Sequence, residues 1–73
     1  MTLDNQIKNY NYRVNVLFKN HLTGWEKRYT VEFPEFWLAM KYVEALQDNE
    51  DIVKIFLLER ISDGSFDITR KFK

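Results

Sequence analysis

His21 and Thr23 are the residues of this chain that come closest to an acid–base pair. Acid–base catalysis needs a nucleophile within hydrogen-bond reach of the base and a further group that orients the base. No neighbour in the sequence supplies either group, and the segment ends at Gly24, which is typical of a turn. We therefore predict no catalytic residue and expect that the protein is not an enzyme.

Metal and cofactor chemistry has equally few candidates. The 73 residues include no cysteine and one histidine, which excludes disulfides, thiolate metal sites and a multi-histidine site within one chain. Three acids, Asp48, Glu50 and Asp51, are clustered. A calcium loop of the EF-hand type needs a glycine at its sixth position, and Val53 stands there. We expect no metal and no cofactor.

Two interpretations of the acidic cluster stay open. The three acids belong either to a solvated loop or to a docking patch for a basic partner. Such a partner would be, for example, a nucleic-acid-binding protein whose ligand the cluster imitates.

The elements that carry these residues begin with a hairpin and a helix. Residues 10–20 and 25–33 alternate apolar and polar side chains, as half-buried strands do, and a turn at 21–24 or 22–25 joins them. Pro34 ends the second strand, and Glu35 is expected in the first turn of a helix that runs to about residue 47. The spacing predicts a helix whose inner stripe is Phe36, Ala39, Met40, Val43 and Leu46.

Two more strands follow. Residues 52–61 have apolar side chains on both faces, which favours a central strand, and an Asp-Gly turn leads to a fourth strand that starts at Phe66. In the third strand, one face is expected to hold Val53, Ile55 and Leu57, and the other Ile52, Phe56 and Leu58. In the fourth strand, one face is expected to hold Phe66, Ile68 and Phe72, and the other Asp67, Thr69 and Lys71.

A right-handed crossover would place the third strand beside the first. The predicted fold is a single-domain α+β layout, β-β-α-β-β, with a four-stranded antiparallel sheet in the order 2-1-3-4 and one helix on one face. Residues 10–73 form this domain, and residues 1–9 are expected to be flexible or weakly docked.

The composition and the apolar runs predict the cellular compartment of the protein. The formal net charge is zero, which argues against a general nucleic-acid or membrane binder. The N-terminus lacks the apolar core of a signal peptide, and no apolar run approaches the ~20 residues of a membrane span. With the absence of cysteine, these features predict a cytoplasmic protein.

One helix covers one face of a four-stranded sheet, so the other face is expected to be open. Its predicted apolar centre is Leu17, Phe56 and Leu58, inside a charged rim. An apolar centre with a polar rim is typical of an interface, although open sheets also tolerate a few outward apolar groups. The rim is predicted to contain Arg13, Lys19, Arg28, Lys54, Arg60 and Lys71, with Glu26, Glu32 and Asp67.

The helix offers a second candidate surface. Leu38 and Tyr42 extend the apolar stripe beyond the arc that a sheet requires, and Trp37 lies on the opposite flank. Either Leu38 and Tyr42 cover the terminal segment or the second hairpin, or all three side chains form part of a homodimer or partner contact.

These surfaces lead to a functional hypothesis. We expect a small non-enzymatic protein that binds another protein, or itself as a homodimer, through the open sheet face and the outer helix flank. The alternative is a sheet domain that binds single-stranded nucleic acid, since basic residues surround Phe56 on the same face. In size, aromatic content and layout the whole chain resembles the compact accessory proteins of bacteriophages, some of which inhibit host factors, although no specific motif carries this resemblance.

Overall fold

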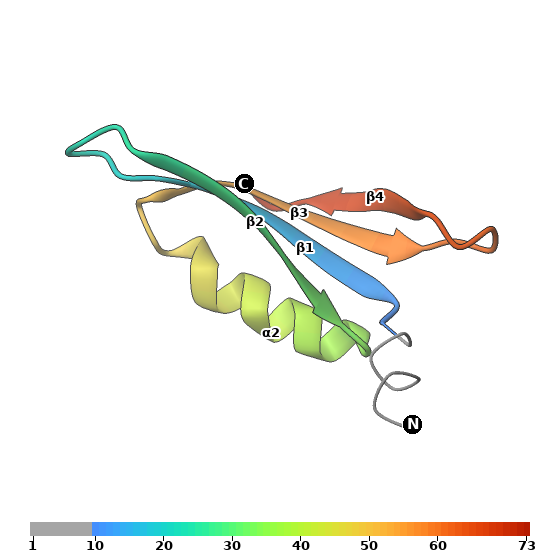
Figure 1. Cartoon of the computed structure of the whole chain (residues 1–73). Helices are drawn as coiled ribbons and strands as arrows, with labels where there is room; N and C mark the ends of the chain where they lie inside the picture. Colours follow the sequence, from blue (N-terminus) through green and yellow to red (C-terminus); the bar gives the residue numbers. More distant parts are fainter. Residues whose placement is uncertain (1–9) are drawn as a thin grey trace, which may run out of the picture.

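The computed structural model describes residues 10–73, and the N-terminal segment 1–9 lies outside the described residues. Four strands and one helix follow one another in the predicted order, β-β-α-β-β (Figure 1). The strands form one antiparallel sheet in the predicted order β2-β1-β3-β4. The elements are β1 (Tyr12–Lys19), β2 (Glu26–Phe33), α2 (Phe36–Gln47), β3 (Ile52–Arg60) and β4 (Phe66–Lys71).

The first hairpin has the register that the alternating pattern predicts. Its apolar cross-strand neighbours are Tyr12 and Phe33, Val14 and Val31, and Val16 and Tyr29. Of the two expected turns, the one at residues 21–24 joins the strands, because the N–H of Asn20 donates to the carbonyl oxygen of Trp25 at 2.7 Å. Gly24 takes a positive φ of 78°, which closes the loop.

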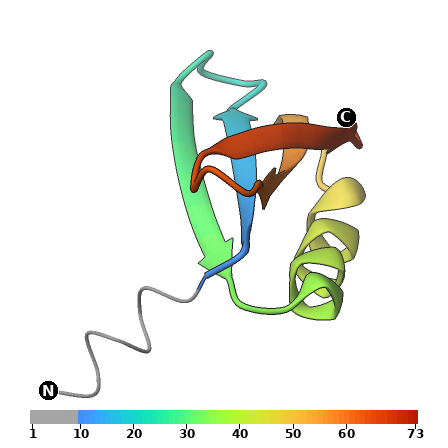
Figure 2. The same ribbon diagram turned by 90° about the vertical axis from the view of Figure 1, so that its right-hand side faces the viewer.

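The helix packs on β1, β2 and β3 and leaves β4 uncovered (Figures 1 and 2). Glu35 is the N-cap residue, not a member of the first turn as predicted, and its side chain makes no capping hydrogen bond. Phe36 is not part of the buried stripe: it is 46% exposed, and its ring lies edge-on to Tyr12. The described residues contain no helix of the length and apolar character that a membrane crossing needs.

The core consists of small aliphatic side chains. All twelve aromatic residues lie within residues 10–73, and none of them is buried. Six aromatic side chains pack around the core and are half-buried against it, so they add apolar contact area at the edge of a small interior. The buried residues are Val14, Val16, Ala39, Val43, Ile52, Ile55 and Leu57.

A bulge in β3 corrects the predicted faces of that strand. Leu17 pairs with Lys54, but the next residue, Phe18, pairs with Ile52, so Val53 is an extra residue in the ladder. Ile52 thereby points to the helix side and is 2% exposed, whereas Val53 is 40% exposed. The prediction that Ile52 shares a face with Phe56 was wrong because a bulge shifts the side-chain alternation by one residue.

A second irregularity, between β3 and β4, corrects the face of β4. Leu57 pairs with Arg70 and Leu58 with Ile68, so the ladder passes over Thr69. Phe72, beyond this point, packs against the core on the helix side. Asp67 pairs with Glu59, on the helix side of the sheet, and not on the open face as predicted.

Candidate functional site

The sheet face opposite α2 is the candidate functional site. We call it the open face. No element of the described chain packs on it (Figures 1 and 2). The ladder pairings place these residues on it: Arg13, Asn15, Leu17, Lys19, Glu26, Arg28, Thr30, Glu32, Lys54, Phe56, Leu58, Arg60, Phe66, Ile68 and Lys71.

The open face is positively charged although the chain as a whole is neutral. It holds six basic residues and two acidic ones, an excess of four positive charges. Within residues 10–73 the ion pairs are Arg13–Glu32 and His21–Asp51, so five of the six cations have no carboxylate partner. These five are Lys19, Arg28, Lys54, Arg60 and Lys71.

Arg13 joins three strands across this face. Its Nε atom donates to Glu32 on β2 at 2.7 Å, and its guanidinium carbon lies 4.0 Å from the centre of the Phe66 ring on β4. An ion pair and a cation–π contact thus both restrain the guanidinium group of Arg13.

The two aromatic rings of the open face both lie beside cations. Arg60 approaches the Phe66 ring to 5.0 Å, in addition to Arg13, and Lys71 lies 6.0 Å from the centre of the Phe56 ring. Phe56 and Phe66 are each half-buried. The rings therefore act first as supports that position positive charge.

The predicted apolar centre is assembled, and it is larger than predicted. Leu17, Phe56 and Leu58 are half-buried on adjacent strands, and Leu58 pairs with Ile68 of β4, which is 59% exposed. Ile68 and Phe66 were missed because they were expected on the other face. Counting residues back from the Asp-Gly turn would have placed them on the open face. The N–H of Ile61 donates to the carbonyl oxygen of Ser65, so Phe66 lies opposite Arg60, a residue already assigned to the open face.

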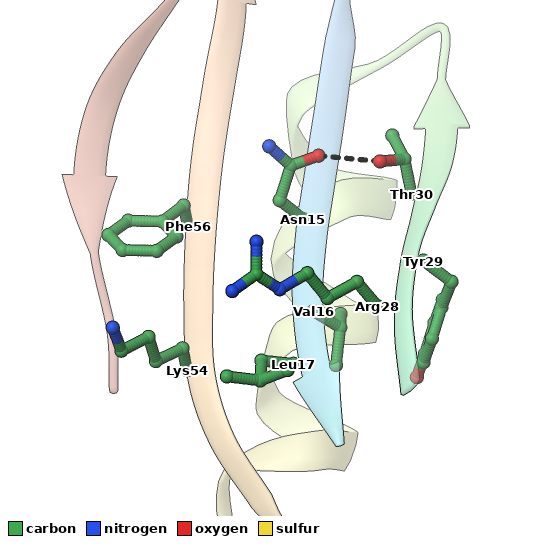
Figure 3. A pocket seen from close by; sticks show the side chains of 8 residues that line it. All are labelled: Asn15, Val16, Leu17, Arg28, Tyr29, Thr30, Lys54 and Phe56. Carbon is green, nitrogen blue, oxygen red and sulfur yellow. Dashed lines mark hydrogen bonds between the residues drawn. The ribbon is translucent and has the colours of Figure 1, made fainter. Parts of the chain in front are cut away.

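An open hollow of about 340 Å³ lies on this face over β1, β2 and β3 (Figure 3). Two cations, Arg28 and Lys54, stand at its border, and Figure 3 shows the side chain of Arg28 reaching over β1 toward Phe56. The hydroxyl group of Thr30 donates to Oδ1 of Asn15 at 2.7 Å on the β2 side. The lining residues are Asn15, Val16, Leu17, Arg28, Tyr29, Thr30, Lys54 and Phe56.

The candidate residues of the helix flank do not form one exposed patch. Trp37 is 57% exposed, but Leu38 and Tyr42 are half-buried. The Tyr42 ring packs 5.3 Å from Phe33, and its hydroxyl group donates to the hydroxyl oxygen of Tyr29 at 3.3 Å. Burial and this hydrogen bond raise the pKa of Tyr42 to about 12. Tyr42 thus covers the first hairpin, where the sequence predicted the second hairpin or the terminal segment.

The three residues of the acidic cluster lie in different environments. Asp48 and Glu50 are exposed, whereas Asp51 is half-buried and binds the β1–β2 loop. Its Oδ1 atom lies 2.5 Å from Nδ1 of His21 and also accepts the N–H of that residue. The hydrogen bond and the charge of Asp51 raise the pKa of His21, and the same hydrogen bond lowers the pKa of Asp51. His21 therefore has a structural partner, and no hydroxyl nucleophile is hydrogen-bonded to it.

Within residues 10–73, no three histidine or acidic side chains are grouped closely enough to hold a metal ion. Comparison of the chain with protein-family models, with curated proteins and with solved structures gave no match. The function is therefore argued from the open face itself.

Proposed function

We propose that this protein is a non-enzymatic binding module that captures a protein partner through the open face. The observation that carries the proposal is the combination, on one sheet face, of a half-buried apolar centre with cations that have no carboxylate partner in the described part of the chain. Interfaces commonly join an apolar centre to a polar rim, and rim charges set the partner's orientation and speed of association.

The positions of these groups add support. Arg13 is held by two contacts on other strands, so its charge requires little further ordering on binding. The apolar centre lies on β1, β3 and β4, which are rigid sheet strands rather than loops. A site on regular elements keeps its geometry better than a site on loops.

A single-stranded nucleic acid is the second candidate ligand. The observation that favours it is the excess of four positive charges beside Phe56 and Phe66, since phosphate contacts and base stacking are the two parts of single-strand binding. The Phe66 ring is, however, already covered by the guanidinium group of Arg13 at 4.0 Å, which occupies space that a stacked base would need.

A homodimer formed by two open faces is disfavoured by charge. Two such faces would bring two excesses of four positive charges together, and like charges across an interface are costly. None of these observations tests the resemblance to phage accessory proteins, and a function of that kind stays a prediction.

Site-specific photo-crosslinking tests the proposal. A benzoylphenylalanine at Ile68, the most exposed apolar position of the open face, is expected to form an adduct in cells that produce the protein, and nuclease treatment is expected to leave the mass of this adduct unchanged. The control places the same group at Lys41, which is exposed on the helix, and is expected to give no adduct.

A double variant strengthens this test. Phe56→Ala with Leu58→Ser removes the apolar centre and should abolish the adduct formed from position 68 while far-UV circular dichroism keeps its native shape. A nuclease-sensitive adduct, or equal adducts from positions 68 and 41, would contradict the proposal.

A further inference from the structure

We infer that the partner segment is acidic and carries one bulky apolar side chain, which enters the hollow between Arg28 and Lys54. This inference rests on the proposed function and adds to it the chemical class of the partner. It uses three observations: the charge of the open face, the lining of the hollow, and the contacts already made by the aromatic rings.

The charge of the open face favours an acidic partner segment. Five cations that have no carboxylate partner within residues 10–73 face solvent on one side of the sheet, while eight of the ten acidic residues in that range lie elsewhere. A partner that brings carboxylates satisfies these cations, and a partner of the same sign is repelled. A second copy that offered its own open face therefore does not fit.

The hollow provides an anchor position. Its volume of about 340 Å³ lies at the lower end of the ~300–1,000 Å³ range of ligand pockets, which suits one large side chain rather than an extended ligand. Phe56 and Leu17 give it apolar contact surface, and the hydrogen-bonded pair of Asn15 and Thr30 closes one side. Large aromatic or aliphatic side chains in such depressions are the usual anchors of protein interfaces.

The cations around the hollow accept carboxylates on either side of that anchor. The Arg28 side chain starts on β2 and crosses β1 toward Phe56, and Lys54 starts on β3, so both cations line the hollow. Acidic residues before and after an apolar residue would then meet one cation each. The expected sequence class is an acidic stretch interrupted by a single tryptophan, phenylalanine or leucine.

The rings distinguish this ligand from a nucleic acid. Phe66 is approached by Arg13 at 4.0 Å and by Arg60 at 5.0 Å, so a base could stack on it only after a guanidinium moved away. A carboxylate needs no such displacement. Nε of Arg13 donates to Glu32, and Nε of Arg60 donates to the carbonyl oxygen of Tyr10. Within residues 10–73, the terminal N–H groups of both side chains are therefore left for a carboxylate. The acidic segment is therefore favoured over the oligonucleotide.

Isothermal titration calorimetry with defined probes tests the inference on the full chain. The probes are a twelve-residue peptide of glutamate and serine with one central tryptophan, the same peptide with alanine for tryptophan, a lysine-for-glutamate version, and a twelve-residue oligothymidylate. We expect the acidic tryptophan peptide to bind most tightly, roughly 10-fold more tightly than its alanine version, and the lysine version not to bind.

A matched pair of variants locates the site. Arg28→Glu with Lys54→Glu should weaken binding of the acidic tryptophan peptide roughly 10-fold or more. Lys27→Glu with Lys41→Glu makes the same change of net charge on exposed residues away from the open face and should leave affinity within roughly twofold. Circular dichroism of both variants checks that each remains folded.

The outcomes separate this inference from the proposed function. If no acidic peptide binds, or if both double variants weaken binding equally, the inference is overturned, while a protein adduct from position 68 would still support the proposed function. If the oligothymidylate binds more tightly than every peptide, the acidic-segment inference fails, and a nuclease-sensitive adduct from position 68 would then overturn the proposed function as well.

Discussion

On the helix-covered face of the sheet, every buried strand residue is Val, Ile or Leu, whereas the open face carries six cations, two phenylalanines and no buried side chain. The same four strands supply both faces, so local propensity does not explain the difference. The difference lies in what each face is packed against: the covered face meets the apolar stripe of α2, and the open face meets solvent. Stability comes from the covered side of the sheet, and the proposed binding uses the opposite side.

Two adjacent residues of β3 should show this contrast most strongly. Ile52→Asn places an amide in the core and removes buried apolar surface, which should cost about 3–5 kcal/mol of unfolding free energy and leave the domain largely unfolded. Val53→Asn, one residue later in the bulge, should cost less than about 1 kcal/mol. Urea unfolding followed by circular dichroism measures both, and equal losses would show that the bulge is misplaced.

The next contrast uses the neighbours Leu57 and Leu58. Leu57 is 2% exposed on the covered face, so Leu57→Ala should lower the unfolding free energy by about 2–5 kcal/mol. Leu58 is half-buried on the open face, and Leu58→Ala should cost less than about 1.5 kcal/mol because less apolar surface is lost. A greater loss at Leu58 would mean that the open face is part of the core.

Smaller effects are expected from the cations of the open face. Arg13→Met removes an exposed ion pair and one cation–π contact, together about 1 kcal/mol. Lys71→Met removes only a contact at 6.0 Å and should change the unfolding free energy by less than about 0.5 kcal/mol. Thermal melts compare the two variants, and indistinguishable melting temperatures would remove the structural role given to Arg13.

The smallest effect concerns His21 and Asp51. The pKa of His21 is raised in the folded state, so the stabilisation by its charged form is complete below about pH 6.5 and is lost as the pH rises through the folded pKa. The lowered pKa of Asp51 sets the acid limit, because its contribution is lost as the pH falls through that pKa. Stability should therefore decline slightly from pH 6 to pH 8, and His21→Asn should flatten this decline. An unchanged slope in the variant would contradict the ion pair.

The fold could be predicted from the sequence because its signals are local. Alternation in residues 10–20 and 25–33, Pro34 before an amphipathic helix, and the Asp-Gly turn at residue 63 each specify an element or a junction without long-range information. The connections then leave few topologies, and the order 2-1-3-4 is one of them.

The faces of the later strands could not be predicted in full, because a bulge is decided by packing. The residue types at Val53 and Thr69 give no sign that these residues are extra in the ladder. Val53 shifts the alternation of β3, so Ile52 points to the helix side, and Thr69 shifts that of β4, so Phe66 lies on the open face. Phe56 and Leu58 lie on the face predicted for them because the alternation of β3 is unbroken after Val53: the extra residue of the second irregularity, Thr69, belongs to β4.

The net charge of the chain does not reveal the charge of the open face, whereas the strand alternation does: all six cations of that face were assigned to it from the sequence, and only Asp67 was placed there wrongly. A net charge of zero argued against an anionic ligand, but the structure separates the charges, and most acidic residues lie away from the open face. Separation of charge in space depends on strand register, which a composition does not contain.

The most direct test of the account follows the leucine methyl groups by NMR during titration with the acidic tryptophan peptide. The account predicts saturable shifts at Leu17 and Leu58, with Leu57 on the other side of the same strand nearly unchanged. Shifts centred on Leu57, or no shift at any of the three leucines while calorimetry reports binding, would place the ligand away from the open face and contradict the central claim.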